Sequence, residues 1–515
     1  MGRLQSGHMT LRFTTSATLL PFALASLASL ASTACPASAQ RPSPALDSIV
    51  RHVMAEQHVV GASVLVSRDG RVLLHQGYGL AELGLGVPST PETAYHIVGP
   101  MLPFTGVAVM QLVERGKLSL TDDISTYVPE FPMQGRRVSI RQLLDHTSGI
   151  VDYHYLGDPI EATSRQPKAL DEVMALYAGR SWVNEPGSKW DWSISGFQLL
   201  VTIVERVSGQ RFADYVQHRI FAPAGLANTS YCDDWSVVRG LSHAYRRFEN
   251  GFVMAKENDM AYNADLRFCS TVGDLTKLWG ALRAGKLLRA ETFRQMATST
   301  GAASQMNALD PKAQYGLALS INHEDDHLRW GQHGSLFGYS GSLYEFPNDK
   351  LTIVVLSNTE GQNAYAITRA LARAVLGLPA LPPGAPPAAA RVLADVALSA
   401  AERGQLDGTY ALKLDRLTPQ LHDSFAQYAR TYRVFDENGR LMIQALGEGP
   451  QRLMKQDDGS YAMRSAPESR MTFVMEAGKA TGLNMASPGL PLSGVRVGGG
   501  DARTFQATRS APGRG

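Results

Sequence analysis

Residues 103–120 read PFTGVAVMQLVERGKLSL. Between residues 104 and 113 the side chains are apolar on nearly every side of a helix, which predicts a buried helix rather than a surface one. Residues 197–207 have the same character and predict a second buried helix. Two buried helices indicate that other elements of the domain, such as strands before and after them in the sequence, cover them on all sides.

Strand-forming stretches lie at both ends of this region. The first is a hairpin with strands at 62–67 and 71–74 around an Arg-Asp-Gly turn. The later strands are expected at 315–321, 328–331, 342–346 and 351–357. This order predicts an α/β (α+β) domain, in which the N- and C-terminal strands meet in an antiparallel sheet and helices pack against it.

The length of 515 residues favours two domains. The composition, 44% hydrophobic and 19% charged, excludes a disordered or fibrous chain. Five of the nine residues 379–387 are proline, which is typical of a stiff spacer. We therefore expect one domain at 43–378, a linker at 379–391, a second domain at 392–500 and a mobile tail at 501–515.

The second domain is predicted to be all-β. Turn signals at Asn438-Gly439, Asp458-Gly459 and Ala477-Gly478 alternate with runs of β-forming residues at 431–435, 441–445 and 471–475. Regular hairpins of this kind indicate a small barrel or sandwich.

The amino terminus predicts export. Arg12 precedes an apolar run of small residues at 17–31 and an Ala37-Ser38-Ala39 cleavage pattern. We expect a signal peptide at 1–39, cleaved after Ala39, and a periplasmic or secreted protein. A lipoprotein anchored through Cys35 is disfavoured because serine stands where an aliphatic residue is expected. The apolar run is too short and too serine-rich for a transmembrane segment, and no other stretch suits one.

The net charge limits the classes of binding partner, and the cysteine content bears on a disulfide. Of the 49 basic residues, Arg3 and Arg12 lie in the leader, so 47 remain against 47 acidic ones. Without a cationic field, nucleic acid and anionic membranes are not expected partners. Export permits a disulfide between Cys232 and Cys269, and two separate buried thiols are the alternative that the sequence leaves open.

Several phrases together resemble one family: PFT at 103–105 with QLVERGKLSL at 111–120, RQLLDHTSG at 141–149, EPG at 185–187 with SGF at 195–197, and VVLSN at 354–358. Over about 45–378 the chain resembles the serine β-lactamase and D,D-peptidase (penicillin-binding-protein-like) superfamily, with its closest match in the class C and esterase-like branch. The C-terminal part is similar to the lipocalin-like barrel often appended to such proteins. The resemblance implies the β-lactamase/transpeptidase-like sheet flanked by helices.

The resemblance also implies a Ser-x-x-Lys motif just before PFT, in which the serine attacks an acyl carbon and the lysine handles its proton. Aligned on Pro103, the serine position is Gly99 and the lysine position is Leu102. None of the eleven lysines has a serine three residues before it, so the motif occurs nowhere in the chain.

Two other family motifs are altered as well. In the Tyr-x-Asn motif the positions are Trp192 and Ile194, and an indole N–H is a donor only. The Lys- or His-x-Gly motif of the strand that edges the site falls on Gln332-His333-Gly334. A slip of one residue would bring His333 into the site.

Losing the nucleophile alone costs on the order of a millionfold in turnover. We therefore expect a pseudoenzyme with no cofactor and no metal, which keeps a cleft for an unknown small or apolar ligand or a protein partner. The cleft residues are expected to be Gly99, Leu102, Trp192, Ile194, Gln332, His333 and Gly334. The alternative is an active hydrolase of ester, amide or D-amino-acid peptide bonds that uses a rearranged site.

Further polar signals have plainer interpretations. Residues 323–327 read HEDDH and match a zinc-peptidase pattern, but their place between two strands predicts a solvated hairpin tip. His146 is expected in a structural turn, and Ser195 is expected to cap the following helix. Asp152 and His154 are expected on a surface loop, and a carboxylate–imidazole pair between them is the less favoured alternative.

Overall fold

The computed structural model describes residues 44–152, 170–179, 182–232, 237–248, 251–255, 267–306, 312–381, 394–413, 431–445, 451–463, 466–487 and 490–498. The predicted leader with its cleavage site, most of the linker and the tail lie outside these residues. Among the helices that are described, none combines the length and apolar character that spanning a bilayer requires.

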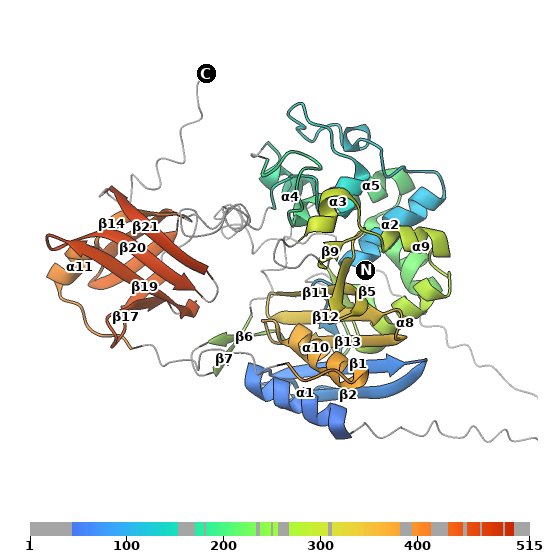
Figure 1. Cartoon of the computed structure of the whole chain (residues 1–515), viewed down its shortest axis with the longest axis horizontal. Coiled ribbons are helices and arrows are strands. Elements are labelled where there is room, and N and C mark those ends of the chain that lie inside the picture. The colour runs from blue at the N-terminus through green and yellow to red at the C-terminus, as the bar shows by residue number, and fades with distance from the viewer. Residues whose placement is uncertain are drawn as a thin grey trace, which may run out of the picture. The chain divides into compact units, whose positions relative to one another are not determined.

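An eight-stranded antiparallel sheet forms the centre of the larger domain, in the order β3-β2-β1-β13-β12-β11-β10-β9 (Figure 1). β1 (Gly61–Arg68) and β2 (Arg71–Glu82) form the predicted hairpin, and Asp69 and Gly70 in its turn have positive φ angles. β1 also pairs with β13 (Leu351–Ser357), so the N- and C-terminal strands meet as predicted. The remaining strands are β3 (Val87–Pro88), β9 (Gln314–Tyr315), β10 (Ser320–Glu324), β11 (His327–Leu336) and β12 (Tyr339–Phe346).

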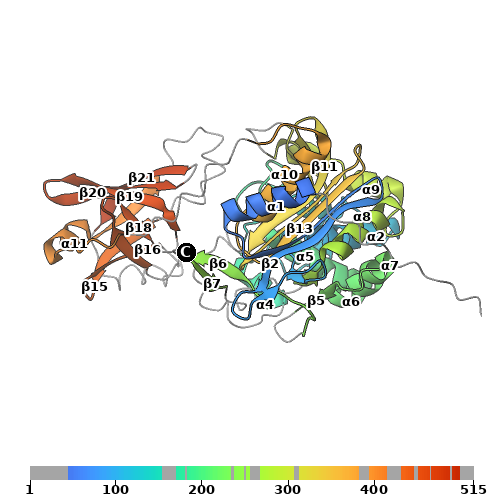
Figure 2. The ribbon, with the colours of Figure 1, turned by 90° about the horizontal axis from the view of Figure 1, so that it is seen from below.

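Helices cover both faces of the sheet, which is why β12 and β13 are buried at every position. α1 (Pro44–Gln57) and α10 (Asn363–Leu376) lie side by side on one face (Figure 2). Adjacent strand residues point to opposite faces. Val355 accordingly packs beneath α1 and α10, whereas Val354 belongs to the core on the other face.

The two predicted buried helices are confirmed as α2 (Leu102–Glu114) and α5 (Ile194–Ser208), which contact each other. Shorter elements complete this domain: α3 (Ile140–Leu144), α4 (Leu170–Tyr177), α6 (Phe212–Val216), α7 (Ala222–Ala224), α8 (Val272–Arg283), α9 (Ala290–Met296), the hairpin β6 (Tyr245–Phe248) and β7 (Gly251–Met254), and a small sheet of β4 (Tyr95–His96), β8 (Phe268–Ser270) and β5 (Ser230–Tyr231).

One predicted strand is wrong in part. The stretch 315–321 is divided between β9 and β10 by a turn, in which Ala318 has a φ of 60° and the Gly316 N–H donates to the Leu319 carbonyl. The Ala318 N–H donates to the Leu144 carbonyl at the end of α3 instead of pairing in the sheet. The apolar sequence resembles a strand because this turn is buried.

The smaller domain is a closed eight-stranded barrel, which confirms the all-β prediction. Its strands are β14 (Gly408–Lys413), β15 (Thr431–Glu437), β16 (Arg440–Ala445), β17 (Gln451–Lys455), β18 (Tyr461–Met463), β19 (Ala466–Glu476), β20 (Lys479–Ser487) and β21 (Leu490–Gly498), preceded by α11 (Ala400–Leu406). The predicted turns at Asn438-Gly439 and Ala477-Gly478 both have positive φ angles, as tight hairpin turns require.

Candidate functional site

Gly99 lies in the turn before α2, where the resemblance places a nucleophilic serine. Its φ is +83°, and a Cβ added to it would lie 2.4 Å from the carbonyl carbon of His333 and 2.6 Å from the Gly334 nitrogen. A Cβ on Gly334 would in turn lie 2.9 Å from the Gly99 nitrogen. The backbone of β11 therefore fills the space in which a side chain at position 99 would begin.

Leu102, at the lysine position, is the first residue of α2 and is fully buried. It belongs to the apolar core that also holds Leu143 and Phe197. An ammonium group buried at this position would lose its hydration, and that loss would drive it towards the neutral amine. The Gly99 N–H donates to the Met101 sulfur at 3.0 Å, which satisfies the turn internally.

At the second motif, Ile194 is the first residue of α5 and is buried. Ser193 is the N-cap, since its hydroxyl accepts the Gly196 N–H at 3.3 Å. The prediction that Ser195 caps this helix is wrong by two residues: Ser195 lies inside the helix, and its carbonyl accepts a hydrogen bond from the Tyr177 hydroxyl.

The prediction that Asp152 lies on a surface loop is wrong, because only 3% of its surface is exposed. Its carboxylate accepts the Ile194 N–H at 3.0 Å and so supports the start of α5. Its predicted neighbour, His154, lies outside the described residues.

Trp192 stacks on His146, with ring centroids 4.4 Å apart and an angle of 27° between the planes. The edge of Tyr315 meets the same imidazole at 4.8 Å. His146 Nδ1 accepts the Ser193 N–H at 3.2 Å, so the ring proton is on Nε2, which donates to the Tyr315 hydroxyl at 3.2 Å. His146 thus lies in the structural turn that the sequence predicts, and it also joins the second motif to β9.

Gln332 and His333 point to opposite faces of β11. The Gln332 amide donates to the Tyr315 hydroxyl and so belongs to the cluster around His146. His333 stacks on Tyr365 of α10 at 4.0 Å, and its Nδ1 lies 2.7 Å from the Tyr344 hydroxyl. In the register of β11, His333 pairs with Ser342. The one-residue shift that would turn His333 towards the site in place of Gln332 therefore does not occur.

The structure thus joins Trp192 and Gln332 through His146 and Tyr315, and it joins Gly99 and Gly334 through direct backbone contact. We name the four side chains of the first group the aromatic cluster. Burial lowers the pKa of His146 to about 3 and raises the pKa of Tyr315 well above its usual range. General acid–base catalysis needs a pKa near the working pH, and burial moves both groups away from it.

The HEDDH segment forms a hairpin tip, as predicted, rather than a zinc-binding helix. β10 ends at Glu324, β11 begins at His327, and these two residues pair across the turn. Glu324 itself is not solvated: its buried carboxylate lies 2.9 Å from Arg369 and 2.8 Å from Arg373, both on α10. The acidic residue of the apparent motif therefore holds α10 on the sheet.

Cys232 and Cys269 form a disulfide, with Cα atoms 5.8 Å apart, which decides between the two alternatives that the sequence left open. The bond joins the end of β5 to β8. His96 on β4 lies beside it, with Nδ1 3.3 Å from the Cys232 sulfur and 3.6 Å from the Cys269 sulfur. Nothing in the sequence near His96 indicates this contact, because it arises from the pairing of three short strands.

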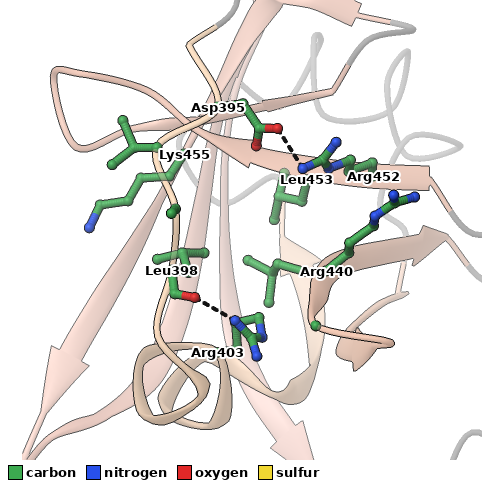
Figure 3. Close-up of a pocket in the computed structure, with 11 residues that line it drawn as sticks. Asp395, Leu398, Arg403, Arg440, Arg452, Leu453 and Lys455 are labelled. Carbon is green, nitrogen blue, oxygen red and sulfur yellow. Dashed lines mark hydrogen bonds and ion pairs between the residues drawn. The ribbon is translucent and has the colours of Figure 1, made fainter.

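A hollow of about 260 Å³ lies on the barrel, between residues 395–398 and the strands β16 and β17. Figure 3 shows Arg452 joined to Asp395 on one side and Arg403 joined to the Leu398 carbonyl on the other. Arg440 also lines the hollow, and it has no carboxylate partner among the described residues. Arg403 and Lys455, which also line the hollow, pair with Asp436 and Glu402, so carboxylates in and beside the hollow balance three of its four cations.

Comparisons with known proteins agree with the fold. A family model described as Beta-lactamase matches residues 46–378. Penicillin-binding protein 4* of Bacillus subtilis is 26% identical over 83% of this chain and 93% of its own length. Protein flp of Staphylococcus aureus is 25% identical over 62% of this chain, and the chain spans only 63% of flp.

Among solved structures, the octameric penicillin-binding protein homologue from Pyrococcus abyssi matches with a TM-score of 0.57 and 22% identity. This match covers 87% of the present chain and 99% of the Pyrococcus abyssi chain, so both domains share its fold. The family model spans well over half of the sequence, and the chain belongs to the β-lactamase family.

Proposed function

We propose that this protein is an exported member of the β-lactamase family that has lost serine acyl transfer and acts by binding a ligand or a protein partner. The observation that carries the proposal is the backbone contact between Gly99 and β11. It means that position 99 lacks a nucleophile and also lacks the space for one.

The other altered positions support the same conclusion. Leu102 is part of the core, and Ile194 gives its backbone N–H to Asp152 while its side chain is buried. At the position of the motif tyrosine, Trp192 has no hydroxyl and presents an indole that is only partly buried. The Cys232–Cys269 disulfide is in keeping with export, because disulfides persist in oxidising compartments.

For the alternative, a hydrolase with a rearranged site, the aromatic cluster offers one hydroxyl beside a basic group: Tyr315, 3.2 Å from His146 Nε2. Two observations argue against its use as a nucleophile. Both side chains are 1% exposed, so an acyl substrate has no approach to them. His146 Nε2 is also the protonated nitrogen, so it donates to the Tyr315 hydroxyl and cannot remove its proton.

The indole of Trp192, which is only partly buried, gives the proposed ligand its chemistry: an uncharged, apolar group that can stack on it. Thermal unfolding in the presence of uncharged aromatic probes tests this, because a ligand of the folded state raises the melting temperature. We expect stabilisation of the wild type that Trp192→Ala abolishes, while Trp182→Ala serves as the control.

Hydrolysis is measured on the same preparations with nitrocefin and short-chain p-nitrophenyl esters. We expect no turnover by the wild type above that of Tyr315→Phe. Turnover that Tyr315→Phe removes would establish the alternative, and a lack of any probe binding that depends on Trp192 would refute the proposed ligand class.

A further inference from the structure

Three side chains with metal-binding atoms converge on the small sheet β4-β8-β5. His96 Nδ1 and the sulfur atoms of Cys232 and Cys269 all lie within 4.8 Å of one another. The backbone fixes them in place: His96 and Cys269 are partners in the β4–β8 register, and the Cys232 N–H donates to the Arg267 carbonyl at 3.2 Å. Thiolate and imidazole are the ligands that zinc prefers in proteins.

The imidazole already has the position that a tetrahedral metal site requires. With zinc about 2.3 Å from sulfur and about 2.0 Å from nitrogen, tetrahedral angles put the nitrogen roughly 3.5 Å from each sulfur. In this protein the two separations are 3.3 and 3.6 Å. The cysteine Cα atoms, 5.8 Å apart, lie on neighbouring strands, so rotation of the side chains suffices to part the two sulfur atoms once the disulfide is open.

We propose that His96, Cys232 and Cys269 form a site for a thiophilic divalent cation such as Zn²⁺ when the disulfide is reduced. A dithiol reductant supplies two electrons by thiol–disulfide exchange, so the S–S bond breaks, two cysteine thiols form and the reductant becomes a disulfide. Binding of the cation then displaces the two thiol protons, and the neutral imidazole completes three protein ligands. The fourth position is left for water.

This exchange preserves the link between β5 and β8 in both redox states. The oxidised chain is joined through the S–S bond and the reduced chain through the metal. β4, which carries His96, ends three residues before Gly99, so the site also anchors the segment that leads into the turn against β11. The inference is independent of the loss of acyl transfer, because it uses no residue of the aromatic cluster.

The test uses the full chain, reduced with a non-chelating phosphine and titrated with Co²⁺ as a spectroscopic substitute for zinc. We expect thiolate-to-cobalt charge-transfer absorption that saturates at one metal per chain, and no such absorption from the oxidised chain. His96→Ala keeps the disulfide and should fold, yet after reduction its metal affinity should fall at least tenfold. His52→Ala, which removes an exposed imidazole from α1, is the matched control.

Circular dichroism of the same samples makes every outcome decisive. A reduced chain that stays folded and binds no cobalt overturns the proposal, and so does a reduced chain that unfolds despite excess zinc. Equal cobalt affinity of His96→Ala and wild type overturns the role of the imidazole. The proposal is supported if cobalt binding saturates at one ion per chain and if the affinity falls in His96→Ala but not in His52→Ala.

Discussion

If the proposed loss of acyl transfer is correct, placing a serine at position 99 should not create activity, because the backbone of β11 occupies the space beside Gly99. In Gly99→Ser, the new Cβ would lie 2.4 Å from the His333 carbonyl carbon, a separation that real Cβ atoms essentially never show. Forcing extra atoms into a packed region costs about 1–3 kcal/mol. The left-handed backbone at φ +83° adds about 1–2 kcal/mol for a residue with a Cβ. We therefore expect Gly99→Ser to lower the free energy of unfolding of the larger domain by about 2–5 kcal/mol.

Gly116→Ser separates the two costs. Gly116 has a φ of +63°, but a Cβ at this position has nothing within 4 Å, so only the backbone cost applies. Urea denaturation followed by intrinsic fluorescence should show Gly99→Ser to be less stable than Gly116→Ser by about 1–3 kcal/mol. The double variant Gly99→Ser with Leu102→Lys should still take up no fluorophosphonate. Equal stabilities of the two serine variants, or stoichiometric labelling of the double variant, would refute the reasoning.

Three further predictions concern two buried polar groups and the disulfide of the larger domain. Glu324→Ala leaves Arg369 without its carboxylate and leaves Arg373 with Asp325 alone, so it should lower the free energy of unfolding by about 3 kcal/mol, whereas Asp326→Ala in the exposed turn should change it little; urea denaturation measures both. Burial lowers the pKa of His146 to about 3, so as the pH falls below about 6.5 the imidazole takes up a proton in the unfolded chain before it does so in the folded chain. The free energy of unfolding should therefore decline between about pH 6.5 and pH 3. In pH-dependent thermal melts, His146→Gln should flatten this decline. The disulfide spans a sequence separation of 37, so Cys232→Ser with Cys269→Ser should cost roughly 4 kcal/mol in metal-free buffer; an unchanged urea midpoint would contradict this.

Much of the fold follows from the sequence because hydrophobic patterning decides it. The run at 104–113 is apolar on all sides, and α2 is buried from Leu102 to Leu112. The Asn-Gly and Asp-Gly pairs predict turns because few residues tolerate positive φ angles, and in the barrel Asn438, Gly439 and Gly459 have them. The pattern fails at Ala318, since a buried turn and a buried strand have the same composition.

The candidate site is less predictable because its contacts join distant segments. Tyr315 reaches His146 across 169 positions in sequence, and His96 reaches Cys269 across 173. Asp152 resembled a loop residue, but its partner is the backbone N–H of Ile194, which no side-chain pattern indicates. The Ser195 cap was misplaced because Ser193, two residues earlier, offers the same hydroxyl.

The most direct test of the proposed loss of the nucleophile is intact-mass spectrometry of the wild-type chain after incubation with a fluorophosphonate and, separately, with a fluorescent β-lactam. The account predicts an unchanged mass with both reagents, while penicillin-binding protein 4* of Bacillus subtilis is carried in parallel as the comparison protein. A stoichiometric adduct that peptide mapping places on any hydroxyl within residues 46–378 would contradict it.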